Sequence, residues 1–234
     1  MSTFDAIREV PLDQAYDVVA QYVDYEANAR FTDGMLRYNC DGRALSSNTT
    51  VDILLINSPE TELVYQSARM VILGPNVRTI SAETFAEISS LQQILIPDTV
   101  TEIGDEAFRD CSQLQEVTIP DMVTDIGCEA FANCCNLERV VLSNETTKIY
   151  SRAFFMCEKL AHINMPETVA DIGDRAFYGC GSLTEMALPY KIGEVGDEAF
   201  RGCFDLHVAV PDTDFNSGAC AFTDCELQFL PALQ

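Results

Sequence analysis

LQEVTIPDMVTDIGCEAFANC, the stretch Leu114–Cys134, sets a pattern that returns along most of the chain with a period of 23 residues. A phenylalanine marks each return, and only the last step is shortened, to 22 residues: Phe85, Phe108, Phe131, Phe154, Phe177, Phe200 and Phe222. A cysteine follows three residues later in six of these repeats: Cys111, Cys134, Cys157, Cys180, Cys203 and Cys225. Periods of this length are typical of solenoids, in which each repeat forms one coil.

The order of apolar and polar residues within one repeat predicts its local structure. Val117–Ile119 alternates apolar, polar, apolar, which indicates a short half-buried strand. Pro120 has no N–H to donate, so the strand is expected to end there. Val123 and Ile126 are expected to point inward from a second extended stretch, and Gly127 then permits a sharp bend.

The Ala130-Phe131 pair is expected to form a compact turn, or a single helical turn, that drives the ring into the interior. One coil has no partner against which to bury its apolar side, so coils must stack. Equivalent residues then lie about 4.8 Å apart along the stack. We therefore predict a mainly β solenoid of about seven coils over residues 65–234, with short turns between its strands.

Residues 1–64 do not follow the repeat, and we predict that they form a small α/β cap over one end of the solenoid. Residues 12–29 have the apolar spacing of a helix. Met35–Tyr38 and Arg43–Leu45 flank a turn-like sequence and predict a hairpin, and Ile53–Ile56 predicts a further strand. A separate recognition module is the alternative reading of this region.

The repeat unit LxxVxIPxxVTxIGxxAFxxC, as it stands at Leu114–Cys134, resembles the BspA-type leucine-rich repeat, over roughly residues 65–230. The resemblance implies an arc-shaped solenoid with a parallel sheet on one face. It also implies a binding function, because members of this family are commonly surface proteins involved in adhesion or in binding host proteins. An enzyme that uses the N-terminal region is a weaker alternative, since residues 1–64 contain no histidine and no glycine-rich phosphate loop.

Composition narrows the classes of partner. The formal net charge is −23, from 14 Lys and Arg against 37 Asp and Glu, and such a surface repels nucleic acid and anionic membranes. Basic proteins or cations are better candidates. No apolar run approaches the roughly 20 residues that span a bilayer, and the start of the sequence lacks the features of a signal peptide. These observations predict a cytoplasmic protein, or an extracellular one if the chain is a fragment.

The ten cysteines raise the question of metal or redox chemistry. The six periodic cysteines are expected to point inward and to pack as small apolar side chains, because they lack the paired spacing of a zinc site. Redox sensing through Cys128 or Cys135 is the alternative. Only two histidines occur, His162 and His207, two coils apart. Because no serine or cysteine is placed beside either, we predict no catalytic, metal-binding or cofactor-binding residue.

The outward strand positions define the surface on which a protein partner is expected to bind. They carry mixed chemistry rather than one sign of charge: Gln93, Leu95, Glu116, Thr118, Arg139, Val141, His162, Asn164, Glu185 and Ala187, with His207 and Ala209 as an approximate continuation. Repeat solenoids commonly bind proteins on such faces. A plain solvated face is the alternative, and the oligomeric state is not predicted.

Two further features interrupt the regular pattern. Acidic residues recur at two edge positions, where basic residues break the columns: Glu102, Asp125, Lys148, Asp171 and Glu194; then Glu106, Glu129, Arg152, Arg175 and Glu198. These edges could hold Ca²⁺ weakly, dock a basic partner or only keep the surface solvated. In the fourth repeat Ser143 replaces proline, Glu145 and Thr146 stand where valine is expected, and Tyr150 replaces glycine. These changes predict either a bulge or altered curvature, or they are tolerated drift.

Overall fold

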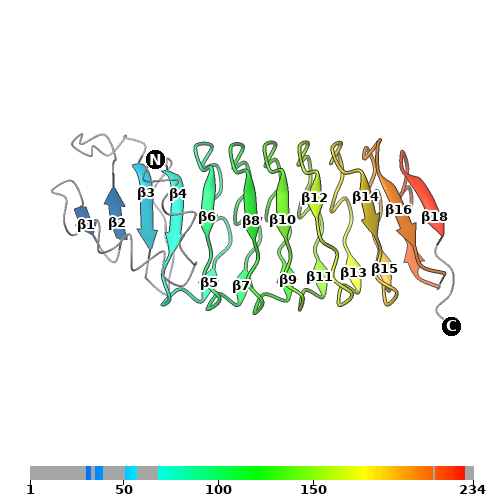
Figure 1. Cartoon of the computed structure of the whole chain (residues 1–234), viewed down its shortest axis with the longest axis horizontal. Helices are drawn as coiled ribbons and strands as arrows, with labels where there is room; N and C mark the ends of the chain where they lie inside the picture. The colour runs from blue at the N-terminus through cyan, green and yellow to red at the C-terminus, as the bar shows by residue number, and fades with distance from the viewer. Residues whose placement is uncertain (1–29, 33–34, 39–50, 57–67, 213, 230–234) are drawn as a thin grey trace.

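Each 23-residue repeat forms one coil, and the coils stack into an elongated solenoid (Figure 1). The computed structural model describes residues 30–32, 35–38, 51–56, 68–212 and 214–229. Within them the predicted β solenoid is confirmed, and its coils are linked by turns, without helices in the described ranges.

One strand of each coil contributes to a row of parallel strands along one side of the solenoid (Figure 1). This row contains β4 (Ala68–Leu73), β6 (Gln93–Leu95), β8 (Glu116–Thr118), β10 (Arg139–Val141), β12 (His162–Ile163), β14 (Glu185–Ala187), β16 (His207–Val210) and β18 (Glu226–Phe229). The strands stay in register: Val117 pairs with Val140, and Val140 pairs with Ile163. Their inward side chains therefore form continuous columns.

The second extended stretch of each coil forms a narrower parallel sheet. It contains β5 (Thr79–Ile80), β7 (Glu102–Ile103), β9 (Asp125–Ile126), β11 (Lys148–Ile149), β13 (Asp171–Ile172), β15 (Glu194–Val195) and β17 (Asn216–Ser217). The inward direction predicted for Ile126 is confirmed, since its side chain is fully buried. The solenoid thus has parallel strands on two sides, where the resemblance implied a sheet on one face.

The phenylalanines form a ladder through the centre of the solenoid. Successive rings from Phe85 to Phe222 stack with centroids 5.0–5.5 Å apart and planes within 11° of parallel. The six rings from Phe85 to Phe200 are fully buried. Burial of this many large rings in one column supplies much of the apolar area that stabilises the stack.

The turns that carry the phenylalanines are bonded from coil to coil. Glu106, Phe108 and Asp110 donate their main-chain N–H groups to carbonyls of the next coil at 2.7–2.8 Å. Glu106 and Asp110 have positive φ, 57° and 61°, and the same two turn positions are left-handed in every repeat from Glu83 to Asp224. This backbone geometry directs these three N–H groups along the stack, while Arg109 and Cys111 donate within the turn, so the turn is satisfied both between coils and within itself.

Gly127 shows how closely the coils approach at the bend after the second sheet. A Cβ atom at this position would lie 2.6 Å from the carbonyl carbon of Gly104, in the preceding coil. The main chain could not move aside without breaking its own inter-coil hydrogen bonds. The glycine is therefore required by close packing as well as by the bend.

Antiparallel strands lie before the first coils. β1 (Arg30–Thr32) pairs with β2 (Met35–Tyr38), which pairs with β3 (Val51–Ile56), and β3 continues in parallel onto β4. The strands predicted at Met35–Tyr38 and Ile53–Ile56 are confirmed. The helix predicted at residues 12–29 and the partner strand predicted at Arg43–Leu45 lie outside the described residues, as does most of the predicted cap.

The irregular fourth repeat keeps the regular path. Lys148 and Ile149 pair in register with their neighbours on both sides, so no bulge interrupts the narrower sheet at this repeat. Ser143 is buried and donates its hydroxyl hydrogen to the Asp121 carbonyl at 3.1 Å. Thr146 is fully buried too, but its hydroxyl has no hydrogen-bond partner.

Candidate functional site

Exposed acidic and basic side chains form a row along the wider side of the solenoid. This first row comprises the leading residue of each strand from β8 to β18: Glu116, Arg139, His162, Glu185, His207 and Glu226. All six are exposed, and neighbours in the row come from neighbouring coils, whose strands lie about 4.8 Å apart where they pair. The row therefore offers both acidic and basic groups to whatever lies against it.

A second row runs beside the first, two residues further along each strand. It contains mainly small or apolar side chains: Thr118, Val141, Asn164, Ala187, Ala209 and Gln228. Val141 is 40% exposed although it is aliphatic. Together the two rows make up what we call the exposed sheet face, and eight of the ten residues predicted to bind a partner lie on it.

The other two predicted residues are placed differently. Gln93 is only 7% exposed and Leu95 is half-buried, so the prediction that this pair faces solvent is wrong for Gln93 and only partly right for Leu95. Their neighbours on β4, Met70 and Ile72, are 1% exposed. The outward side of the sheet is thus closed over at β4, and the exposed sheet face begins at β8.

The exposed sheet face contains a hollow of about 610 Å³ that extends over β18, β16 and β14 as far as the boundary between β14 and β12. Strand pairing is interrupted here, so the row of strands consists of one sheet up to β12 and another from β14 to β18. The hollow is lined by Ile163, Met165, Glu185, Met186, Ala187, His207, Ala209 and Gln228. The repeat pattern did not predict this hollow, because the interruption falls one repeat later than the irregular fourth repeat.

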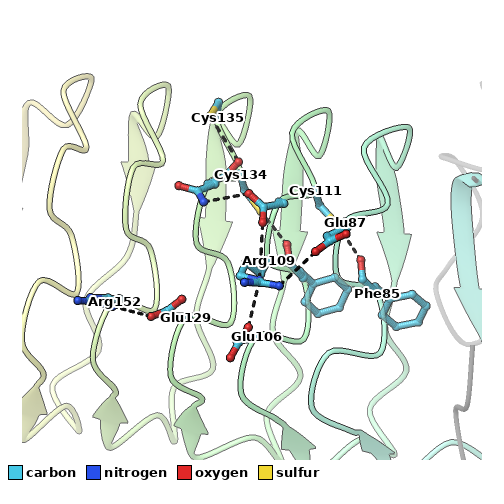
Figure 2. A network of polar contacts seen from close by, with 12 residues as sticks. Phe85, Glu87, Glu106, Arg109, Cys111, Glu129, Cys134, Cys135 and Arg152 are labelled. Atoms are coloured by element: carbon cyan, nitrogen blue, oxygen red, sulfur yellow. Dashed lines mark hydrogen bonds and ion pairs between the residues drawn. The ribbon is translucent and has the colours of Figure 1, made fainter. Parts of the chain in front are cut away.

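The periodic cysteines form a ladder beside the phenylalanines, and each thiol has a defined partner. Cys111 donates to the main-chain carbonyl of Phe85 at 3.1 Å, and Cys134 donates to that of Phe108 at 3.2 Å (Figure 2). Cys157, Cys180, Cys203 and Cys225 repeat the same contact. Sequence reasoning treated these side chains as small apolar groups; the structure adds a hydrogen bond between each cysteine and a preceding coil.

Burial raises the pKa of every ladder thiol. Desolvation raises the pKa of Cys111 and Cys203 to about 12, and raises that of the fully buried Cys157 well above its usual value. Burial, followed by nearby carboxylates, also raises the pKa of Cys128 and Cys135. A raised pKa leaves little thiolate at neutral pH, which argues against redox sensing through Cys128 or Cys135.

Alkylation should therefore separate the cysteines into two classes. With iodoacetamide at pH 8, we expect the exposed Cys220 to react at least about tenfold faster than Cys134, Cys157 or Cys180, because alkylation needs an accessible thiolate. Peptide mapping by mass spectrometry would give the rate at each position. The ladder cysteines should become reactive in denaturant, and rapid modification of Cys157 in the native protein would contradict their burial.

Basic residues neutralise the acidic edges of the turns. Figure 2 shows the guanidinium of Arg109 between the carboxylates of Glu87 and Glu106, at 3.3 and 3.1 Å. Arg152 pairs with Glu129 at 2.8 Å. These pairs are at least partly exposed and each is worth about 1 kcal/mol or less, so their role is to relieve repulsion between stacked acids.

Further along this edge, Glu198 accepts from two arginines. Arg175 contacts it at 2.6 Å, and Arg201 contacts its other oxygen. Hydrogen bonds from both arginines lower the pKa of the Glu198 carboxyl. The acidic column is thus locally compensated at the coils where basic residues replace acids.

The two histidines do not come together. His162 lies on β12 and His207 on β16, with β14 between them, and His207 instead lies 3.3 Å from the Glu226 carboxylate. Within the described ranges, no three His, Cys, Asp or Glu side chains converge on a common point as metal ligands would. The same part of the chain contains no helical segment with the length and apolarity needed to cross a bilayer.

Comparison with known proteins identifies the repeat. The model of the BspA type leucine-rich repeat region matches six copies over residues 78–207, more than half of the chain. The chain belongs to the BspA-type leucine-rich repeat family. The matched copies run from the segment before β5 to the start of β16 and include most of the exposed sheet face. No curated protein matches the chain significantly.

Solved structures of similar proteins share this BspA-type solenoid. A leucine-rich repeat protein from Bacteroides ovatus is 23% identical, with a TM-score of 0.63 over 86% of this chain. The chain spans only 56% of that protein's length. A T. pallidum leucine-rich repeat protein is 30% identical, with a TM-score of 0.55, and the match covers 65% of this chain and 71% of that one.

A leucine-rich cell surface protein from Faecalibacterium prausnitzii is 23% identical, with a TM-score of 0.51, and the match covers 87% of this chain and 76% of that one. At this identity the likeness shows the fold alone. BspA-type repeats thus account for the architecture of this chain, and leucine-rich repeat solenoids typically serve as binding scaffolds. The ligand must be argued from the exposed sheet face itself.

Proposed function

We propose that this BspA-type solenoid is a protein-binding scaffold and that its partner docks on the exposed sheet face. The observation that carries the proposal is the first row, in which exposed Glu116, Arg139, His162, Glu185, His207 and Glu226 follow one another on successive strands. Rigid stacking holds these groups at fixed spacing. A partner surface with the complementary order of charges would meet all of them at once.

The second row supports the same reading. Val141 is aliphatic and 40% exposed, and the neighbouring positions of this row are mostly small. Protein interfaces combine an apolar central surface of this kind with a polar rim. The formal net charge of −23 further favours a partner that is basic overall, since an acidic one would be repelled.

Charge reversal on the face tests the proposal. The chain, carrying an affinity tag, would capture partners from lysate, and each identified partner would then be purified and titrated calorimetrically. Arg139→Glu, His162→Glu and Glu185→Lys each remove one charge match, and we expect at least one of them to weaken binding about tenfold, equivalent to about 1.4 kcal/mol. A reversed rim charge should also slow association.

Matched control variants lie outside the exposed sheet face. Lys191→Glu makes the same kind of charge change as Arg139→Glu, and Glu194→Lys mirrors Glu185→Lys on exposed residues away from the face. Neither control should change the affinity by more than about twofold. If all three face variants bind the purified partner like the original chain, the exposed sheet face is not the binding surface.

The compartment is a separate prediction. The sequence predicts the cytoplasm, with an extracellular adhesin-type protein as the alternative, and the same face would serve in either place. Labelling of intact cells with a membrane-impermeant amine reagent decides between them. Modification of the chain before lysis would establish the extracellular alternative.

A further inference from the structure

The hollow begins where the row of strands is interrupted between β12 and β14, and it extends from there over β14, β16 and β18. In the fully described segment that holds both strands, residues 68–212, neither strand pairing nor a main-chain hydrogen bond joins β12 to β14. The rest of the same two coils is closed: β11, β13 and β15 pair in sequence, and Phe154 stacks on Phe177 at 5.3 Å. The coils therefore separate only on the exposed sheet face.

Asn164 lies beside this interruption, and its side chain bonds the preceding coil. Its side-chain oxygen accepts the N–H of Leu142 at 2.7 Å, and its amide nitrogen donates to the Leu142 carbonyl at 3.1 Å. In regular coils the equivalent N–H bonds a main-chain carbonyl, as Ile119 does to Val141 at 2.8 Å. An asparagine side chain thus replaces a main-chain partner on the β10 side of β12, and on its other side β12 has no strand partner.

The opening exposes residues that are interior elsewhere. Ile163 and Met165 are only partly buried, whereas their counterparts one coil earlier, Val140 and Leu142, are 1% and 2% exposed. With Met186 they give the hollow an apolar floor. Two of these three are methionines, whose flexible side chains adapt to a range of apolar shapes. Exposed Glu185 and His207 also line the hollow, and His207 lies 3.3 Å from the Glu226 carboxylate.

We propose that this hollow receives an apolar side chain of a basic, extended segment in the protein partner. The proposal rests on the function proposed above and names the anchor point of the partner. The apolar floor would bury the side chain, and the unjoined strands on either side present main-chain groups to an extended segment. Buried anchors of this kind commonly dominate the affinity of an interface.

The net charge of the chain favours a basic partner segment over a second copy of the chain as the occupant of the hollow. Glu185 at the rim and the formal net charge of −23 attract a basic segment, whereas two identical copies would repel one another. The observations therefore favour a basic partner.

Three peptides test the chemistry of the occupant directly. The probe is the fluorescein-labelled heptapeptide KSKFKSK, compared with KSKAKSK and ESEFESE, and binding to the whole chain is followed by fluorescence anisotropy. We expect the phenylalanine peptide to bind at least about tenfold more tightly than its alanine counterpart, and the acidic peptide to bind more weakly still. Equal affinities for KSKFKSK and KSKAKSK would overturn the proposal, as would tighter binding of ESEFESE.

Two variants place that preference at the hollow. Ala187→Leu enlarges an apolar side chain among the lining residues. Asn164→Val removes the amide that bonds the Leu142 main chain beside the hollow. Each variant should reduce the preference for phenylalanine to less than about threefold. Thr118→Leu is the matched control, because it makes a similar addition in the second row at a strand that pairs normally. Circular dichroism establishes that each variant is folded. A preference that survives both hollow variants would overturn the proposal.

The outcome is distinguishable from failure of the proposed function. If Arg139→Glu lowers the affinity for a purified partner while Ala187→Leu and Asn164→Val do not, the exposed sheet face binds protein and the hollow is not the anchor point. Sedimentation that shows dimers of the free chain, lost in Ala187→Leu, would instead assign the hollow to a second copy.

Discussion

Phe154→Ala is expected to lower the free energy of unfolding by about 3–5 kcal/mol. The ring is fully buried and lies between Phe131 at 5.4 Å and Phe177 at 5.3 Å. Its removal deletes apolar contacts on both sides and leaves a cavity in the middle of the ladder. The coils cannot collapse into that cavity, because their turns are hydrogen-bonded to one another at fixed spacing.

Equilibrium denaturation in urea, followed by circular dichroism, measures this loss; the chain has no tryptophan for a fluorescence signal. Phe204→Ala is the matched control, since this ring is 72% exposed and its removal should change stability by less than about 0.5 kcal/mol. Because contacts in a solenoid are made only with neighbouring coils, the variant is also expected to broaden the transition. A loss below about 1 kcal/mol would contradict the stacked core.

Thr146→Val is expected to raise the free energy of unfolding by about 1–3 kcal/mol. Thr146 occupies the column of Val123 and Val169, and all three are fully buried. Its hydroxyl has no hydrogen-bond partner, so folding removes that group from water without compensation. Valine has the same shape and carries a methyl group where threonine carries the hydroxyl.

The same denaturation experiment gives the sign of this effect. Thr124→Val is the control: this threonine is exposed, so the same exchange should leave stability within about 0.5 kcal/mol. A destabilising Thr146→Val would mean that the hydroxyl is hydrogen-bonded in solution. The neighbouring substitution at Ser143 needs no such correction, because its hydroxyl is bonded to the Asp121 carbonyl.

Much of the exposed sheet face was predictable for the same reason as the core. Strand residues alternate between the two faces, so the outward positions from Glu116 to Ala187 follow directly once Val117 and Val140 are assigned to the interior. The prediction failed at Gln93 because exposure depends on what lies over a face. The repeat pattern describes the coil itself, whereas the outward side chains of β4, Met70 and Ile72, are buried together with Gln93 at this end of the sheet.

The hollow was not predictable, because the interruption at which it begins leaves no mark on the repeat pattern. Asn164 occupies an ordinary outward position, and nothing in its spacing distinguishes it from Thr118 or Ala187. Whether its amide points to solvent or bonds the Leu142 main chain is decided by the geometry of the neighbouring coil. The irregular fourth repeat, which did stand out in the sequence, kept its register because its replacements fit the same column positions.

The amino-acid sequence by itself determined the period, the columns and the inward residues. Every coil must bury the same positions against its neighbours, so the same residue types recur at those positions in each repeat. Only the tertiary structure decided which parts of the face are open, which thiols bond a carbonyl and where two strands part. Those features arise from contacts between coils, where a main-chain bond, a side-chain bond and solvent differ by little free energy.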